Sequence, residues 1–219
     1  KERHAPEGDY KLPWAKSPVV LVDTSGLEPW TAKACGRSTR FNLFHAGGVT
    51  HLVNEVLDAG YDPEEIAVVV PGEAQLKAVQ KLLWHDNLTS ILVATLQQFQ
   101  NTDRDVVIFD LPDGPPLEVL RNLGGTEPDL ARRLLNVPLS RARRQAILLC
   151  NLPYLRDKTP ADAPLARLLK KVETDHPVVP LAEVVGQTPD VLKMWCDLAP
   201  GGYSSERFEK DLAESSGDV

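Results

Sequence analysis

The sequence predicts an α/β domain with a mainly parallel β-sheet flanked by helices, and three observations lead to this fold class. Five short runs rich in Val, Ile and Leu recur within the first 151 residues. The runs are nearly continuous in apolar character, as expected of strands that are buried on both faces of a parallel sheet. Segments with helical spacing separate the first three runs, and such alternation indicates a doubly wound sheet.

The first strand, helix, strand unit spans residues 19–70. Its strands are the runs VVLVDTS at 19–25 and IAVVV at 66–70. Between them, GGVTHLVNEVLDAG at 47–60 carries Val and Leu residues at helical spacing, and Gly60 is a favourable helix stop. A helix is therefore predicted over 47–60.

The remaining elements of the sheet follow in the same manner. GEAQLKAVQKLLWHD at 72–86 has an apolar helical face, and it connects the second strand to SILVATL at 90–96. Two further apolar runs, DVVIFDL at 105–111 and QAILLCN at 145–151, are predicted as strands. In a doubly wound sheet the loops at the carboxyl ends of the strands normally carry the chemistry, so we expect the functional residues there.

The chain is predicted to divide into four parts, with the α/β domain at 19–151. Residues 1–18 form a lead-in that prolines punctuate. Residues 152–203 combine many prolines with short helical patterns, which predicts a helical appendage packed on the sheet. Residues 204–219 are polar and end in small residues, so they are expected to be a flexible tail.

Composition argues against a disordered, collagen-like or membrane protein. Of the 219 residues, 42% are hydrophobic and 25% are charged, as in ordinary globular proteins. No apolar run approaches the roughly 20 residues of a membrane span, and the first residues carry no hydrophobic signal core. The three cysteines lie far apart without metal-ligand or disulfide spacing. We expect an intracellular protein, cytoplasmic or nuclear, with no membrane partner and no metal site of its own.

Charge is distributed unevenly along the chain. The net charge is -7, which argues against a generally basic nucleic-acid binder. Yet RRLLNVPLSRARRQAIL at 132–148 gathers five arginines around a short apolar segment. A solvated basic face is one interpretation of this cluster, and a local phosphate-binding site is the other.

Two segments imitate parts of a nucleotide-triphosphatase site. ACGRST at 34–39 resembles the end of a phosphate loop, but Thr31 stands where the motif has its first glycine and Arg37 replaces its lysine. This segment is predicted to be a surface turn. Asp110 ends an apolar strand, like a magnesium-binding aspartate, but without a phosphate loop it is predicted to be an ordinary strand end.

Self-contained hydrolase chemistry is not indicated either. The sequence has no GxSxG elbow, and its five histidines lack the spacing of HExxH or other ligand motifs. His51 falls on a predicted helix and is interpreted as a packed or capping residue.

Four segments in a fixed order resemble a known family. They are GRSTRFN, IAVVVPGEAQ, ILVATLQQFQNTDRDVVIFD and RRLLNVPLSRAR. Together they resemble the second RecA-like domain of superfamily 1 helicases, particularly the nonsense-decay branch with the patterns TxxxFQGxExDxVI and LNVALTRAR. The resemblance covers residues 19–151, and it implies a RecA-like fold of the P-loop NTPase type that itself lacks a phosphate loop.

The resemblance also implies site residues. In that family ATP lies with Mg²⁺ between two RecA-like domains, and the second domain supplies an arginine that stabilises charge on the γ-phosphate. Arg141 matches this arginine finger. Gln100 and Asp103 match positions near the nucleotide, whereas Thr95 and Gln97 match positions that touch the nucleic-acid backbone. One segment is thereby implied to sense both ligands.

The sequence departs from the family pattern at several positions. Asn101 replaces the glycine, Asp103 is shorter than the family's glutamate, and Pro138 replaces the alanine before the finger. Leu76 stands where a basic residue often follows the glutamine of GEAQ. Pro138 lacks an amide donor and is expected to kink or start the helix that carries Arg141.

The other four arginines of the cluster are not assigned to the site. If a helix runs through the whole segment, Arg141 shares a face with Val137 and Pro138, whereas Arg144 shares one with Ser140. The arginines then cannot all point into one cleft. Those outside it, including Arg132, Arg133 and Arg143, are expected to be solvated or paired with acids.

Two functions follow from these patterns. In the first, the chain is the carboxyl-terminal motor domain of an ATP-dependent helicase, completes the ATP site of an upstream first RecA-like domain, and holds single-stranded DNA or RNA. The magnesium ligands and the phosphate loop then belong to that first domain, so this chain alone should not hydrolyse ATP. In the second, it is a decayed helicase-like scaffold that binds protein through its C-terminal helical region.

Overall fold

The computed structural model describes residues 10–27, 30–33, 40–117, 123 and 128–185. The strands in this part of the chain are β1 (Val19–Asp23), β2 (Ala32–Lys33), β3 (Arg40–Phe41), β4 (Ile66–Val70), β5 (Leu92–Thr95), β6 (Arg104–Leu111), β7 (Ala142–Cys150) and β8 (Val178–Pro180). The α-helices are α1 (Leu43–Asp58), α2 (Glu73–His85), α4 (Pro128–Arg141), α5 (Leu152–Lys158), α6 (Pro164–Asp175) and α7 (Leu181–Val184).

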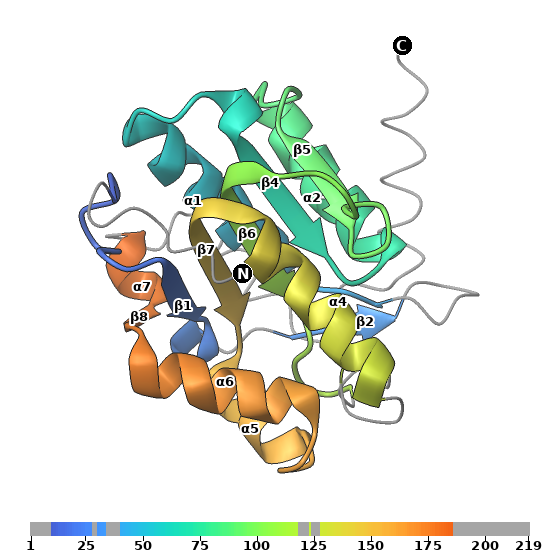
Figure 1. The fold of residues 1–219 in the computed structure, drawn as a ribbon. Helices are drawn as coiled ribbons and strands as arrows, with labels where there is room; N and C mark the ends of the chain where they lie inside the picture. The colour runs from blue at the N-terminus through green and yellow to red at the C-terminus, as the bar shows by residue number, and fades with distance from the viewer. Residues whose placement is uncertain (1–9, 28–29, 34–39, 118–122, 124–127, 186–219) are drawn as a thin grey trace.

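One six-stranded sheet organises the molecule (Figure 1). Its strand order is β5-β4-β6-β7-β1-β8, and every neighbouring pair in it is parallel. Strands β2 and β3 form a separate two-stranded antiparallel pair. The predicted fold class is therefore confirmed.

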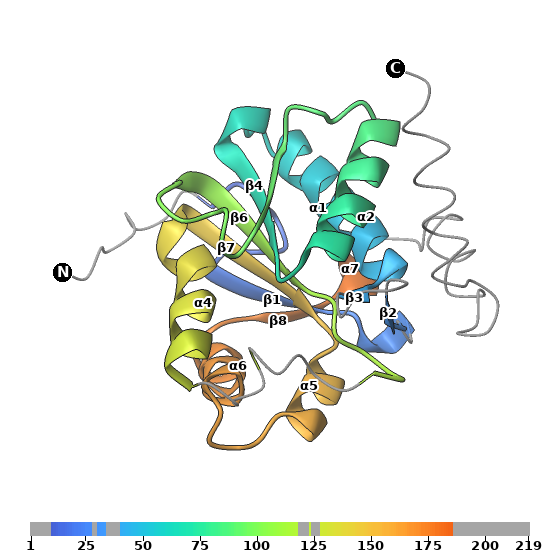
Figure 2. The ribbon, with the colours of Figure 1, turned by 90° about the vertical axis from the view of Figure 1, so that its right-hand side faces the viewer.

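Helices cover both faces of the sheet, with α1 and α2 on one side and α4 and α6 on the other (Figure 2). Side chains alternate along a strand, so each face receives its own set of apolar residues. In β4, Ile66, Val68 and Val70 pack with α1 and α2 in one core, and Ala67 and Val69 pack in the other. All five residues of β4 are fully buried, which explains the continuous apolar run.

The predicted elements are found with shifted ends. Helix α1 begins at Leu43 rather than 47, because the Asn42 side chain caps it by accepting a hydrogen bond from the His45 amide. Gly60 lies just beyond it with a φ of 83°, as expected of a helix stop. The last predicted strand begins earlier, at Ala142 rather than 145.

The segments outside 19–151 pack onto the same body. Leu12 and Ala15 of the lead-in are fully buried, and the Gln145 side chain donates to the Ala15 carbonyl. The segment predicted as a helical appendage contains α5, α6 and α7, but it also adds strand β8 alongside β1. The predicted turn at 34–39 and the tail at 204–219 lie outside the described residues. None of the helices described combines the length and hydropathy of a membrane span.

Candidate functional site

The segment from Thr95 to Asp103 runs from one edge of the sheet to the other. Thr95 pairs with Val70 at the carboxyl ends of β5 and β4. Asp103 directly precedes Arg104, which pairs with Ala142 at the amino ends of β6 and β7. Thr95 and Asp103 are thereby placed at opposite edges of one parallel sheet.

At the carboxyl edge, Thr95 closes a tight turn. Its hydroxyl accepts a hydrogen bond from the Gln98 amide at 3.3 Å, and its own amide donates to the Gln98 side chain at 3.0 Å. The Thr95 side chain is buried, whereas Gln97 is exposed. The Gln98 side chain also donates to Glu73, at the start of α2, at 3.3 Å. Gln97 is thus exposed to solvent on a turn that is hydrogen-bonded to α2.

Asn101, which replaces the family's glycine, has a backbone conformation that glycine favours. Its φ is 69°, in the left-handed region that glycine favours and that asparagine tolerates better than most residues. The departure counted against the site is therefore compatible with the geometry of the loop. Gln100, next to it, is exposed.

At the amino edge, Arg141 and Asp103 meet. A guanidinium nitrogen of Arg141 lies 3.1 Å from a carboxylate oxygen of Asp103, and their side chains are 34% and 23% exposed. The Arg104 side chain donates to the Asp103 carbonyl at 2.9 Å. The structure thus joins two of the three residues predicted to contact the nucleotide, and Gln100 lies on the same segment as Asp103.

Arg141 and Asp103 lie away from the carboxyl ends of the strands, where we expected the functional residues, whereas Thr95 lies at such an end. Arg141 is the last residue of α4, and Asp103 comes directly before β6. In a parallel sheet each connection must return the chain to the amino edge before the next strand starts. Residues that end a connection therefore lie at the amino edge, as this pair does.

Pro138 neither starts nor ends the helix that carries Arg141. It lies buried within the last turn of α4, which continues to Arg141. Leu76 is buried in the core between α2 and the sheet, so it contributes no charge to a site.

Three of the other four arginines contact carboxylates, and the Arg133 side chain donates to the backbone carbonyl of Asp129 at 3.3 Å. Arg132 lies 3.9 Å from Asp129, and both Arg143 and Arg144 contact Asp105, at 3.7 Å and 2.8 Å. The expectation that Arg144 shares a helical face with Ser140 is wrong, because α4 ends at Arg141 and Arg144 belongs to β7.

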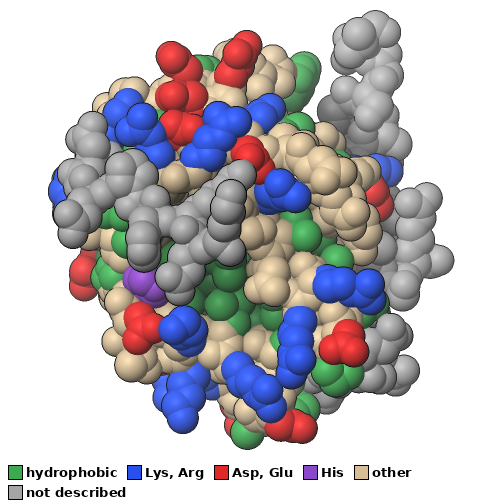
Figure 3. All heavy atoms as spheres, viewed as in Figure 1, with side chains coloured by type: hydrophobic (Ala, Val, Ile, Leu, Met, Phe, Trp, Pro, Cys, Tyr) green, Lys and Arg blue, Asp and Glu red, His purple; other side chains and the backbone are tan. Residues whose placement is uncertain are grey.

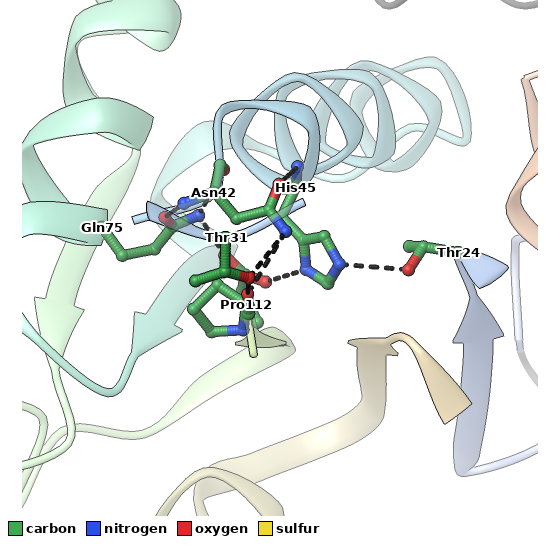
Figure 4. Close-up of polar contacts among 7 residues, drawn as sticks. Thr24, Thr31, Asn42, His45, Gln75 and Pro112 are labelled. Carbon is green, nitrogen blue, oxygen red and sulfur yellow. Dashed lines mark hydrogen bonds and ion pairs between the residues drawn. The ribbon is translucent and has the colours of Figure 1, made fainter. Parts of the chain in front are cut away.

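Sequence reasoning missed a buried polar network at the carboxyl ends of β1 and β6 (Figure 4). Asp110 was predicted to be an ordinary strand end, yet its side chain is fully buried. One carboxylate oxygen lies 2.7 Å from His45 Nδ1, and the other accepts from Gln75 at 2.7 Å. His45 Nε2 in turn lies 3.0 Å from the Thr24 hydroxyl.

The network continues to the starts of α1 and α2. The Gln75 side chain accepts from the Asn42 amide at 2.7 Å and donates to its carbonyl at 3.2 Å. Asn42 Nδ2 and the Thr31 hydroxyl both donate to the Pro112 carbonyl. A charged residue inside an apolar run was the available clue, because a buried carboxylate requires partners.

His51 belongs to α1, and its side chain is partly buried, which agrees with the interpretation as a packed residue. Its imidazole lies 3.8 Å from Glu55 on the next turn. Burial lowers the pKa of this imidazole, and the nearby carboxylates of Glu55 and Asp58 oppose that change.

Comparison with known proteins supports a helicase relationship. The model of the family described as "AAA domain" matches residues 1–153. The chain is 29% identical over 142 residues to the "DNA replication ATP-dependent helicase/nuclease DNA2" of Bos taurus, which covers 64% of this chain and 12% of that protein. It is 28% identical over 150 residues to the "Regulator of nonsense transcripts 1 homolog" of Drosophila melanogaster, which covers 65% of this chain and 12% of that protein. A match to the "Putative regulator of nonsense transcripts 1" of Takifugu rubripes is 24% identical over 208 residues and covers 92% of this chain and 18% of that protein.

Proposed function

This chain belongs to the AAA domain family and is related to helicases, and on that premise we propose that it is the second motor domain of a superfamily 1 helicase. In this role it lies carboxyl-terminal to a first RecA-like domain. That domain supplies the phosphate loop and the ligands of Mg²⁺, and this chain supplies the arginine that completes the ATP site. The protein works inside the cell, in the cytoplasm or the nucleus.

The observation that carries the proposal is the pairing of Arg141 with Asp103 at the amino edge of the sheet. The Arg141 side chain is about one-third exposed, so a phosphate oxygen can reach it and replace the carboxylate. A planar guanidinium keeps its charge and binds oxygen pairs in a fixed geometry. Such a group stabilises the charge that develops on the transferred phosphoryl oxygens.

The opposite edge is proposed to hold single-stranded DNA or RNA. There the exposed Gln97 is presented by the turn that Thr95 closes. Amide side chains bind phosphate and sugar oxygens without reading sequence, so this contact is expected to be tolerant of sequence. The segment 95–103 connects the two edges directly, which offers a short path along which a bound strand can influence Arg141.

The test is ATP hydrolysis by the polypeptide that joins this chain to its upstream motor domain. With saturating single-stranded nucleic acid, Arg141→Ala is expected to lower kcat by on the order of 10³-fold, as loss of other arginine fingers does. Arg141→Lys keeps the charge but not the planar fork and is expected to recover only part of the rate. An unchanged rate in Arg141→Ala would reject the motor assignment and leave the scaffold alternative.

A further inference from the structure

The pairing of β6 with β7 changes register directly after the Arg141–Asp103 pair, between Arg104 and Val106. Arg104 pairs with Ala142, an offset of 38 residues, whereas Val106 pairs with Gln145, an offset of 39. Between these two pairs β6 has one residue, Asp105, and β7 has two, Arg143 and Arg144. This two-against-one arrangement is a β-bulge in β7.

The single residue opposite the bulge contacts both residues of the bulge. The Asp105 carboxylate accepts from Arg144 Nε at 2.8 Å, and its other oxygen lies 3.7 Å from a guanidinium nitrogen of Arg143. Asp105 is only 14% exposed, which makes its ion pairs less open to solvent than those on the outer surface of α4. One carboxylate thus holds two arginines that would otherwise repel each other.

The bulge sets the register at which β7 enters the sheet, directly after Arg141 at the end of α4. Arg141 and Asp103 are separated by 38 residues, the offset found below the bulge. If the offset of 39 continued to the end of the strands, Arg104 would pair with Arg143, and Arg141 would be displaced by one residue relative to β6. Successive side chains of a strand point to opposite faces, so a slip of one residue redirects the side chains beside it.

We propose that Asp105 is a positioning residue, which holds the β7 bulge through Arg143 and Arg144 and thereby aims Arg141 at the nucleotide. This inference rests on the proposed function, because it assigns Asp105 a part in the same ATP site. Asp105 itself does not contact ATP. It acts through the backbone that connects α4 to β7.

The first test is structural and does not depend on ATP hydrolysis. In a crystal structure of this chain with Asp105→Ala, Arg104 is expected no longer to pair with Ala142. Arg141 is then expected to lie beyond hydrogen-bond distance of Asp103. Asp129→Ala is the matched control, because it removes a carboxylate that pairs with Arg132 on α4 away from the bulge. An Asp105→Ala structure that keeps both the bulge and the Arg141–Asp103 contact would overturn the proposal.

The second test is kinetic and uses the polypeptide that contains both motor domains. Misplacement of a catalytic group by about 1 Å can cost on the order of 10²-fold in rate, so Asp105→Ala is expected to lower kcat by up to that factor. The KM for ATP should change little, since Asp105 does not contact the nucleotide. In an Arg141→Ala background the same substitution should have no further effect on kcat.

Two outcomes separate this inference from the proposed function. If Arg141→Ala leaves kcat unchanged, the proposed function fails, whatever Asp105 does. If Arg141→Ala lowers kcat but Asp105→Ala does not, or lowers it equally in both backgrounds, only the positioning role fails. Should Asp105→Ala fail to fold, Asp105→Asn keeps one acceptor for Arg144 and is judged by the same comparison, with a smaller loss expected.

Discussion

Replacing Asp110 tests whether the buried network stabilises the fold as its geometry indicates. Asp110→Ala removes two acceptors and leaves His45 Nδ1 and one Gln75 N–H without partners in a fully buried site. Each buried polar group left unsatisfied costs about 1–3 kcal/mol. Because two such groups lose a partner, we expect the free energy of unfolding to fall by about 2–6 kcal/mol.

Asp110→Asn should cost less, for a reason specific to this site. The new amide oxygen can accept from Gln75, and the new amide nitrogen can donate to His45 Nδ1. The imidazole then carries its proton on Nε2 and donates to the Thr24 hydroxyl, which already lies 3.0 Å away. His45 and Gln75 keep partners, and only one N–H of the new amide and the Thr24 O–H are left without an acceptor in this network, so we expect a smaller loss than in Asp110→Ala.

The assay is urea unfolding of the isolated chain, followed by circular dichroism, at constant pH. Asp129→Ala serves as the control, because Asp129 is 93% exposed and its contact with Arg132 should contribute less than about 1 kcal/mol. Equal losses in Asp110→Ala and Asp110→Asn, or a loss below about 1 kcal/mol in Asp110→Ala, would refute this reasoning.

Three further predictions concern single groups. Burial lowers the pKa of His51 and of His176, so the unfolded chain binds protons that the folded chain does not. The free energy of unfolding should therefore fall as pH drops below about 6.5, and less steeply in His51→Gln/His176→Gln; an equally steep fall in the double variant would contradict this. Burial raises the pKa of the Cys150 thiol well above its usual range. With Cys35 and Cys196 replaced by serine, a thiol reagent should therefore label the chain only as it unfolds. Rapid labelling in native buffer would count against this burial. Because Asn101 has a φ of 69°, Asn101→Val should lower the free energy of unfolding by about 1–2 kcal/mol and Asn101→Gly should change it little, a difference that urea unfolding would detect.

The central strands were predictable because strands buried on both faces consist almost entirely of apolar residues. Every residue of β4 is buried, and the run IAVVV at 66–70 marks that strand without ambiguity. Strand β8 could not be predicted in this way, because it has three residues, ends in Pro180 and depends on pairing with β1. The start of β7 was equally hidden, because Arg143 and Arg144 lie in the strand from Ala142 onwards but charged residues carry no apolar period.

The candidate site was predictable only in part. The pairing of Arg141 with Asp103 joins residues 38 apart, and the two were named together only because the family motif includes both. The network around Asp110 joins residues 35 and 65 positions away, which no local pattern reveals. The left-handed backbone of Asn101 could not be predicted either, because the identity of one residue does not fix its φ.

If opposite edges of one sheet serve the two ligands, separate substitutions should impair ATP hydrolysis and nucleic-acid binding independently. In the polypeptide with both motor domains, kcat for ATP hydrolysis and the Kd for single-stranded nucleic acid are measured for Arg141→Ala and Gln97→Ala. We expect Arg141→Ala to lower kcat and leave Kd unchanged, whereas Gln97→Ala should raise Kd and leave kcat at saturating nucleic acid near its original value. This expectation would be contradicted if Arg141→Ala weakened nucleic-acid binding while kcat was retained.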